Sequence, residues 1–234
     1  MNKVKEKLRR GGTVLVFNPN FPSPALVEHA GSLGFDVAFI DCEHGSSGFE
    51  RVEELARAAR AAGMTSILRP WSMERGLVTR YLDCGVGGIQ FPAIESADAA
   101  REAVDIVRAA RGDRFADTLV AVMIESPAAV ANLAAIVAVE GIDAVVVGLA
   151  DLASSLGHPG DGRHPEVRRA VDDIIRTASR SGGAVAGFNL HHWEEGRDLK
   201  EKGVRWLTIH PKTLLARGTT ALTGLIGDTA GKAR

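Results

Sequence analysis

"LVAVMIESPAAVANLAAIVAVEGIDAVVVG", residues 119–148, contains the alternation that decides the fold. An unbroken apolar run ends at Glu125, and Ser126 and Pro127 then begin a segment of helical periodicity that ends at Gly141. A second apolar run follows directly. Because short continuous apolar runs are typical of strands buried on both faces, this stretch predicts a strand, a helix and a second strand of one parallel sheet.

The same alternation occurs along the whole chain, and many of the helical segments end in glycine, as expected before a following strand. The predicted strands are TVLVFN (13–18), DVAFID (36–41), SILRP (66–70), GIQFPA (88–93), LVAVMIE (119–125), DAVVVG (143–148), AVAGFN (184–189) and RWLTIH (205–210). The predicted helices begin at Pro24, Phe49, Met73, Ala97, Pro127, Pro165, Trp193 and about Thr213. Such successive units with short joints predict a (β/α)8 TIM barrel, as a single domain over residues 1–234.

The main alternative is an open, doubly wound α/β sheet. That fold commonly carries a glycine-rich phosphate loop after its first strand. Here the corresponding segment, FNPNFPSP at residues 17–24, contains no glycine. The barrel is therefore favoured, and its functional side chains are expected where the strands end.

The composition is that of an ordinary globular protein, with 45% hydrophobic and 24% charged residues among 234. With 28 Lys and Arg against 29 Asp and Glu, the net charge of -1 provides no general attraction for nucleic acid or an anionic membrane. No apolar run approaches the roughly 18 residues that span a bilayer. The basic residues 1–12 are expected to lead directly into the first strand, and we interpret the protein as cytoplasmic, with Cys42 and Cys84 as reduced thiols.

Polar residues follow the predicted strands. They are Asn18, Asp41, Glu43, His44, Arg69, Gln90, Glu125, Asp151, Asn189 and His210. Glu125 and Asp151 each follow an apolar run, and a carboxylate so close to a core is costly unless it is paired or binds metal. Two carboxylates at adjacent strand ends suit a hard cation such as Mg²⁺ or Mn²⁺. A salt bridge from Glu125 to an arginine is the alternative.

Three further features each leave two interpretations open. Arg69 at a strand end suits a substrate carboxylate or phosphate, or pairs with Glu125 or Asp41. His44 is either a general base near neutral pH or a turn histidine. The amides after Gly148 either bind an anion at a short helix start or form a simple turn.

Five segments, taken together and in order, resemble the HpcH/HpaI aldolase family, the metal-dependent class II pyruvate aldolases of the phosphoenolpyruvate/pyruvate barrel superfamily. They are DCEHG (41–45), ILRP (67–70), YLDCGVGGIQFP (81–92), IESPAAVANL (124–133) and VEGIDAVVVGLADLASSLG (139–157). The resemblance covers nearly the whole chain. It implies a homo-oligomer, a trimer or a hexamer, that uses Mg²⁺, Mn²⁺ or Co²⁺.

The resemblance also implies a role for particular residues. Glu125 and Asp151 match the two metal ligands, and Arg69 matches the arginine that contacts the pyruvyl oxygen. His44 matches the base. Asp41 is the first of two acids that orient this histidine.

The second acid matches Asp83, which in family oligomers reaches across from a neighbouring subunit. The backbone around Gly148, Ala150 and Asp151 matches the pocket for the substrate carboxylate. Three departures from the family pattern stand out: a shorter segment between the fourth and fifth strands, Met123 in place of a polar glutamine, and Cys42 in place of a glycine.

The implied activity is the reversible cleavage of a 4-hydroxy-2-oxoacid into an aldehyde and pyruvate, or the close analogue hydroxypyruvate. One alternative is a non-catalytic barrel that binds a 2-oxoacid, and another is a citrate-lyase-like lyase acting on an acyl-CoA. A Schiff-base aldolase would need a lysine at a strand end, and Lys212, just beyond the eighth strand, is the one lysine near such a place.

Overall fold

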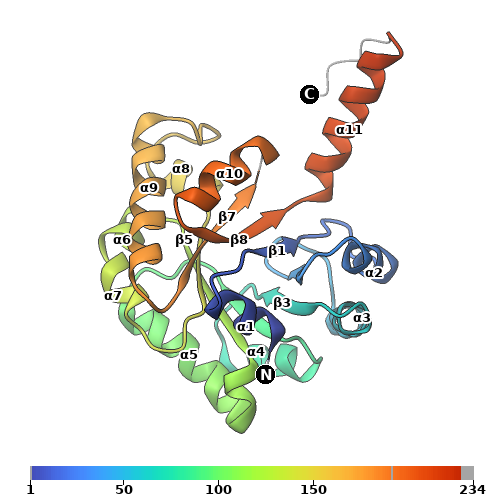
Figure 1. The fold of residues 1–234 in the computed structure, drawn as a ribbon. Coiled ribbons are helices and arrows are strands. Elements are labelled where there is room, and N and C mark those ends of the chain that lie inside the picture. Colours follow the sequence, from blue (N-terminus) through green and yellow to red (C-terminus); the bar gives the residue numbers. More distant parts are fainter. Residues whose placement is uncertain (1, 191, 228–234) are drawn as a thin grey trace.

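The computed structural model describes residues 2–190 and 192–227. Over these residues, eight parallel strands close into a barrel in which each strand pairs with its neighbours in sequence and β8 returns to β1 (Figure 1). The strands are β1 (Val14–Phe17), β2 (Val37–Asp41), β3 (Thr65–Arg69), β4 (Gly88–Phe91), β5 (Leu119–Ile124), β6 (Ala144–Val147), β7 (Val185–Leu190) and β8 (Val204–Ile209). The predicted (β/α)8 barrel is confirmed.

Helices follow the strands and surround the barrel. They are α1 (Lys3–Arg9), α2 (Pro24–Ser32), α3 (Phe49–Ala61), α4 (Arg75–Asp83), α5 (Ala97–Arg111), α6 (Pro127–Ala131), α7 (Leu133–Val137), α8 (Leu149–Ser155), α9 (Pro165–Arg180), α10 (Gly196–Glu201) and α11 (Pro211–Leu225), with 3-10 turns η1 (Gly112–Asp117) and η2 (Trp193–Glu195). The start predicted at Met73 is wrong by two residues, because the Glu74 carboxylate accepts the first amides and α4 begins at Arg75. The start predicted near Thr213 lies at Pro211, a favoured first helical residue.

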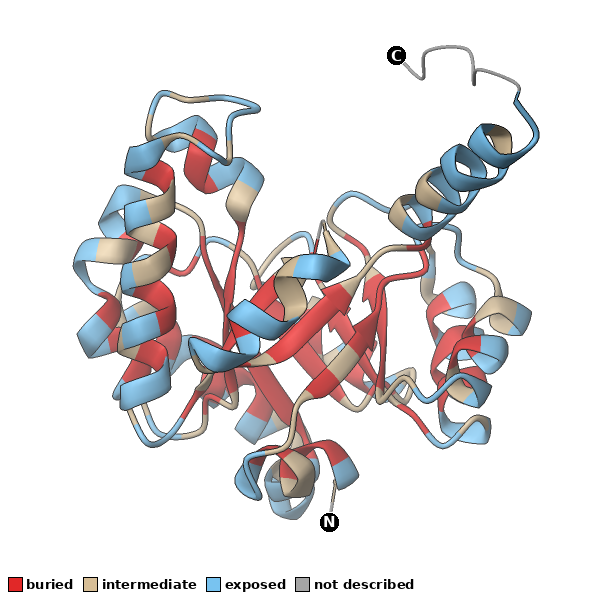
Figure 2. Ribbon diagram, turned by 45° about the horizontal axis from the view of Figure 1, so that its top comes forward, coloured by how far each residue is buried: buried red, intermediate tan, exposed pale blue. Residues whose placement is uncertain are grey.

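Apolar side chains fill two layers. One layer lies inside the barrel and includes Val16, Phe39, Met123 and Trp206. The other lies between the strands and the surrounding helices. Figure 2 shows the buried residues concentrated on the strands and on the helix faces turned toward them. Since strand residues alternate between these layers, alternate residues at each strand end reach the mouth of the barrel.

Helix α1 was not predicted, and it is followed directly by β1, as the basic start of the chain was expected to be. Its Val4 and Leu8 join the inner apolar layer, and Lys5 Nζ lies 3.1 Å from Asp143 Oδ2. The helix sits under the amino-terminal ends of the strands (Figure 1). It therefore closes the end of the barrel opposite the strand termini that carry the polar residues.

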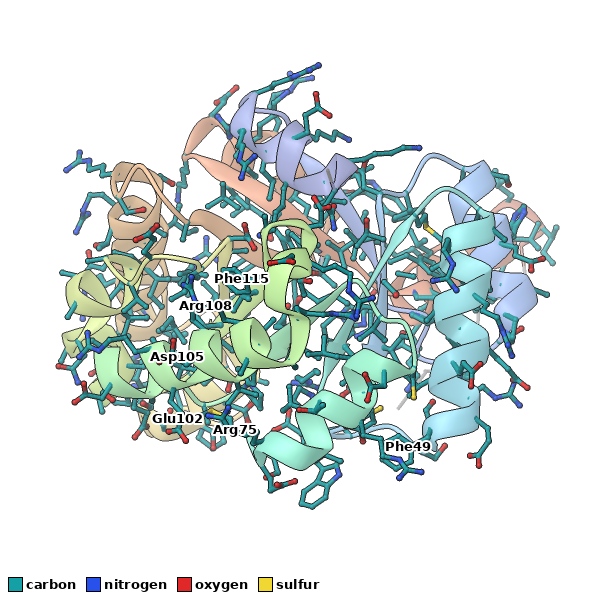
Figure 3. The ribbon with its side chains drawn as sticks, turned by 90° about the horizontal axis from the view of Figure 1, so that it is seen from below. Phe49, Arg75, Glu102, Asp105, Arg108 and Phe115 are labelled. Carbon is teal, nitrogen blue, oxygen red and sulfur yellow. The ribbon has the colours of Figure 1, made fainter. Side chains whose placement is uncertain are left out.

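The connection between β4 and β5 consists of α5 and the short turn η1. The Arg108 guanidinium lies 4.3 Å from the centre of the Phe115 ring, and Lys5 Nζ lies 5.7 Å from the same ring. Figure 3 shows Arg108 and Phe115 next to each other at this connection. The segment that is shorter than the family pattern is thus packed against the helices around it.

Helix α11 projects away from the barrel (Figure 1). It has several exposed large apolar side chains. They are Leu214, Leu215, Leu222, Leu225 and, just past its end, Ile226. A row of leucines this exposed is unusual for an isolated protein surface. No helix in the described part of the chain has both the length and the hydropathy needed to cross a membrane.

Candidate active site

Asp41 and Arg69 are the last residues of neighbouring strands, and they are paired in the strand register. Arg69 Nη2 lies 2.7 Å from Asp41 Oδ2, and Arg69 Nε lies 3.1 Å from Asp41 Oδ1. Only 12% of the Arg69 side chain is exposed. This bidentate pair fixes the plane of the guanidinium at the mouth of the barrel.

Glu43 makes a second ion pair with Arg69, with its Oε2 2.9 Å from Nη1. Burial opposes the charge on Arg69, but the hydrogen bonds and charge of Asp41, with Glu43 and Glu125 nearby, outweigh it and raise the pKa of Arg69. Burial likewise raises the pKa of Asp41, yet the hydrogen bonds and charge of Arg69 bring it below its usual value. Both partners are therefore held in their charged forms.

The turn after β2 is built around Asp41. Its Oδ1 accepts hydrogen bonds from the backbone amides of Glu43 at 3.1 Å and His44 at 3.2 Å. A Cβ at Gly45 would collide with the Asp41 carbonyl oxygen, so only glycine fits there. Cys42 points to the opposite side, where burial raises the pKa of its thiol to about 11.

Glu125 directly follows β5. Its Oε2 accepts a hydrogen bond of 2.8 Å from the amide of Ala93, a residue in the left-handed region with φ of 51°. A Cβ at Gly148 would overlap the Glu125 carboxylate, so the glycine makes room for this side chain. Burial raises the pKa of Glu125, and although the Ala93 amide opposes this, the negative charges of Asp151 and Glu43 add to the rise.

Asp151 lies in the first turn of α8, next to Glu125. The Ser155 hydroxyl lies 2.8 Å from the backbone carbonyl oxygen of Glu125 and 2.6 Å from that of Asp151, which connects the two segments. The two carboxylates repel each other, and a cation between them would remove that repulsion. Oxygen donors of this kind fit a hard divalent ion such as Mg²⁺ or Mn²⁺.

His44 lies at the rim, with 68% of its side chain exposed and its Nε2 3.8 Å from Glu43 Oε2. It lines a cavity of about 350 Å³ together with Asp41. The polar side chains that line the rest of this cavity come from the ends of β1 and β8 and from the turn after β2. They are Asn18, Asn20, Ser46, Ser47 and Lys212.

Residues 14–204 match the HpcH/HpaI aldolase/citrate lyase family. The chain belongs to this family. A 2-keto-3-deoxy-L-rhamnonate aldolase from Escherichia coli O17:K52:H18 is 31% identical over 237 residues, covering 92% of this chain and 88% of the relative. The predicted family is confirmed, and so is the prediction that the chain is an aldolase, a carbon-carbon lyase.

Solved structures of the HpcH/HpaI family agree with this assignment. A family protein from Burkholderia cenocepacia J2315 superposes with a TM-score of 0.88 and 29% identity, over 97% of this chain and all of the other. An HpcH/HpaI aldolase from Desulfitobacterium hafniense DCB-2 has a TM-score of 0.85 and 28% identity, over 97% of both chains. The similarity thus includes the complete barrel.

In this member of the HpcH/HpaI family, strand ends bring Asp41, Arg69 and Glu125 close together, with Asp151 at the start of α8. Asp83 lies elsewhere. It is the last residue of α4, at the amino-terminal end of the barrel, where its negative charge interacts with Arg111. Within one chain, therefore, Asp83 does not reach His44.

Asp41 pairs with Arg69, one of the alternatives that the sequence left open, and its carboxylate does not contact the His44 ring. Its carboxylate binds the Arg69 guanidinium and the amides of the turn, and the carboxylate next to the His44 ring belongs to Glu43. Glu43 is thus a site residue for which no role was predicted. The signal for it was its position between Asp41 and His44 in a turn that follows a buried strand.

Met123 takes the place where a polar glutamine was noted in family relatives. Its sulfur lies 3.9 Å from Arg69 Nη1, so a weak acceptor contacts the guanidinium from inside the barrel. Gln90, on the neighbouring strand, is 4% exposed, and its Oε1 has no hydrogen-bond partner among the described residues. An amide is therefore present in this layer of the HpcH/HpaI barrel, on a different strand.

A second group of possible metal ligands consists of His158, His164 and Glu166, whose ligand atoms all lie within 4.8 Å of one another. His158 Nε2 is 3.0 Å from Glu166 Oε2, and His164 Nδ1 accepts the Glu166 amide at the start of α9. The two rings stack with centres 3.4 Å apart and planes 19° apart. In nearly parallel rings the in-plane lone pairs run alongside each other and do not converge on one ion. This group therefore stabilises a turn, and the pair of Glu125 and Asp151 fits a metal better.

Proposed function

We propose that this aldolase reversibly cleaves a 4-hydroxy-2-oxoacid into an aldehyde and pyruvate, or its close analogue hydroxypyruvate, with a divalent cation. The observation that carries the proposal is the pair of adjacent carboxylates, Glu125 and Asp151, beside the buried guanidinium of Arg69. The 2-keto-3-deoxy-L-rhamnonate aldolase relatives support this substrate class.

Glu125 and Asp151 would hold the cation, which when bound supplies a Lewis acid for negative charge on the 2-oxo and carboxylate oxygens. Arg69 has five N–H donors, and its ion pairs orient the remaining ones toward the 2-oxo oxygen as charge develops there. The first amides of α8, at Ala150 and Asp151 after Gly148, bind the substrate carboxylate.

His44 acts as the base that removes the C4 hydroxyl proton during cleavage and returns it during synthesis. Its exposed ring is free to turn toward the cavity, and its Nε2 lies 3.8 Å from Glu43 Oε2. Asp41 keeps the turn that carries His44 in place through two backbone hydrogen bonds. We also assign the protein to the cytoplasm, where its free thiols Cys42 and Cys84 stay reduced, and treat residues 1–234 as one barrel domain.

The proposed activity predicts that the protein exchanges the methyl protons of pyruvate for deuterium only when a divalent metal is present. Removal of these protons is the half of the reaction that every candidate aldehyde shares. Proton NMR of pyruvate in D₂O, with metal-stripped protein and then with Mg²⁺, Mn²⁺ or Co²⁺ restored, measures it directly. Absence of exchange with all three metals would overturn the proposed function.

The protein is further proposed to be a homo-oligomer, a trimer or a hexamer, in which Asp83 of one chain completes the site of the next. The exposed leucines of α11 and the distance of Asp83 from its own site support this assembly. His44→Asn and Asp83→Asn variants are each expected to be nearly inactive alone. Mixed oligomers, formed after dissociation and reassembly, should regain activity, because one site then contains both native residues. Mixtures that stay inactive would contradict the shared site.

A further inference from the structure

A second cavity lies at the amino-terminal end of the barrel, between α1 and the segments that lead into β6, β7 and β8. Its volume is about 410 Å³, within the usual range of small-molecule sites. Leu8 of α1 lines it and also belongs to the inner apolar layer of the barrel. Because that layer separates the cavity from the mouth of the barrel, a ligand bound here does not contact the active-site side chains.

Among the described residues, three cations and one carboxylate line this cavity. They are Lys5, Arg9, Arg205 and Asp143. Asp143 Oδ2 lies 3.1 Å from Lys5 Nζ and accepts the Val120 amide at 2.9 Å. Burial raises the pKa of Asp143, and the charges of Lys5 and Arg9 oppose that rise. The carboxylate of the cavity is therefore already paired with Lys5, whose side chain is only 6% exposed.

Arg205 carries a positive charge that this carboxylate does not balance. Its Nη1 donates to the backbone carbonyl oxygens of Lys200 at 2.7 Å and Val204 at 3.0 Å, which are neutral acceptors. Within residues 2–190 and 192–227, no carboxylate forms an ion pair with Arg205. The two bonds hold the half-buried guanidinium in place and use the hydrogens of one nitrogen. The hydrogens on Nε and Nη2 remain for an anion, in the fork geometry that suits carboxylates and phosphates.

The rest of the cavity wall leaves room for such an anion. Gly182 and Gly183, between α9 and β7, line the cavity, and a Cβ at either position would meet no atom within 4 Å. Gly203, just before β8, also lines it, and a Cβ there would collide with the Ser179 side chain. Ser179 itself lines the cavity, so its hydroxyl group is a further donor for an anion.

We propose that this cavity binds a small metabolite through a compact anionic group, a phosphate or a carboxylate, held by Arg205 together with Arg9 and Ser179. The two groups share the oxygen atoms that a guanidinium recognises. A ligand bound between Arg9 and Arg205 connects α1 to β8, so it stabilises the position of α1 under the strands (Figure 1). This site is separate from the active site, and its existence does not depend on the proposed function.

Thermal unfolding over a range of inorganic phosphate and succinate concentrations tests the proposal, with sodium chloride at equal ionic strength as the reference. The wild-type melting temperature should rise with at least one of the two anions, because a ligand of the folded state stabilises it, and the concentration dependence gives Kd. Arg205→Met should raise that Kd roughly ten- to a hundredfold, as expected for a lost hydrogen bond to a charged group. Arg9→Met, at an exposed position on α1, should raise it by a smaller factor.

Two control variants separate this cavity from the rest of the surface and from the active site. Arg197→Met removes the same charge from an exposed position on α10, and Lys212→Met removes a charge from the cavity beside His44. Both should keep the wild-type Kd. The anion with the lower Kd identifies the group that the site prefers.

Three results would overturn the proposal: no rise with either anion, an unchanged Kd in Arg205→Met, or an equal change in a control variant. If Arg205→Met does not fold, an unchanged Kd in Arg9→Met overturns it instead. Pyruvate methyl exchange plays no part in this test, so its outcome is separate from that of the proposed function.

Discussion

Glu125→Gln is expected to abolish the metal-dependent exchange of the pyruvate methyl protons, with a loss of at least about a hundredfold. The amide keeps the size of the side chain and one oxygen, but it loses the charge that a divalent cation requires. Its hydrogen bond with the Ala93 amide can persist through that oxygen. Exchange rates by NMR and Mn²⁺ affinity by calorimetry measure the two effects together.

The same substitution should make the metal-free protein more stable at neutral pH. Burial raises the pKa of Glu125 above its unfolded value, so the carboxyl group stabilises the fold at low pH, and this contribution is lost as pH rises through the folded pKa. Glutamine does not ionise, so the variant does not lose this stability as the pH rises. Glu102→Gln, on the exposed face of α5 (Figure 3), is the matched control and should change neither exchange nor stability. Full exchange in Glu125→Gln would mean that Glu125 is not a metal ligand.

Arg69→Met is expected to reduce both activity and stability. Without the guanidinium, Asp41 and Glu43 are left as largely buried carboxylates with no cation between them, a change that costs about 3 kcal/mol for a buried pair. The developing charge on the 2-oxo oxygen loses a donor, which typically costs about 10²–10³ in kcat. Urea unfolding and methyl exchange measure the two losses.

The stability loss in Arg69→Met should depend on pH. Arg69 lowers the pKa of Asp41, so this pair contributes fully above the unfolded aspartate value of about 3.9, and its contribution falls as pH drops through the folded pKa. The difference in unfolding free energy from wild type should therefore shrink in acid. Arg101→Met breaks an exposed pair with Asp98 on α5 and should cost little at any pH. If Arg69→Met lowers the free energy of unfolding as little as Arg101→Met does, the Arg69 pairs do not stabilise the fold.

The fold could be predicted from sequence because its strands are short, continuous and apolar, and because glycines mark the helix ends. Each of these signals is local, and eight repetitions leave few topologies. Helix α1 was not predicted because its seven residues are mostly charged and its apolar residues are Val4 and Leu8 alone. Its position depends on a tertiary contact that no local pattern shows.

The site could be predicted in part for a related reason. Parallel strands bring their ends together, so Asp41, Arg69 and Glu125 were expected near one another once a barrel was assumed. Asp41 and Glu125 were both possible partners of Arg69, and the choice between them depends on the strand register and on side-chain length. Arg69 proved to bind Asp41 and Glu43, an outcome that only the aligned ends of β2 and β3 explain.

The closure of the barrel by α1 determines the order in which substrates bind and products leave. With Val4 and Leu8 packed under the inner apolar layer, ligands pass through the opposite end alone. In the proposed reaction the pyruvate portion lies deepest, against Arg69 and Glu125, and the aldehyde portion lies outside it. During cleavage the aldehyde must therefore depart first, and during synthesis pyruvate must enter first, which makes the kinetic mechanism ordered.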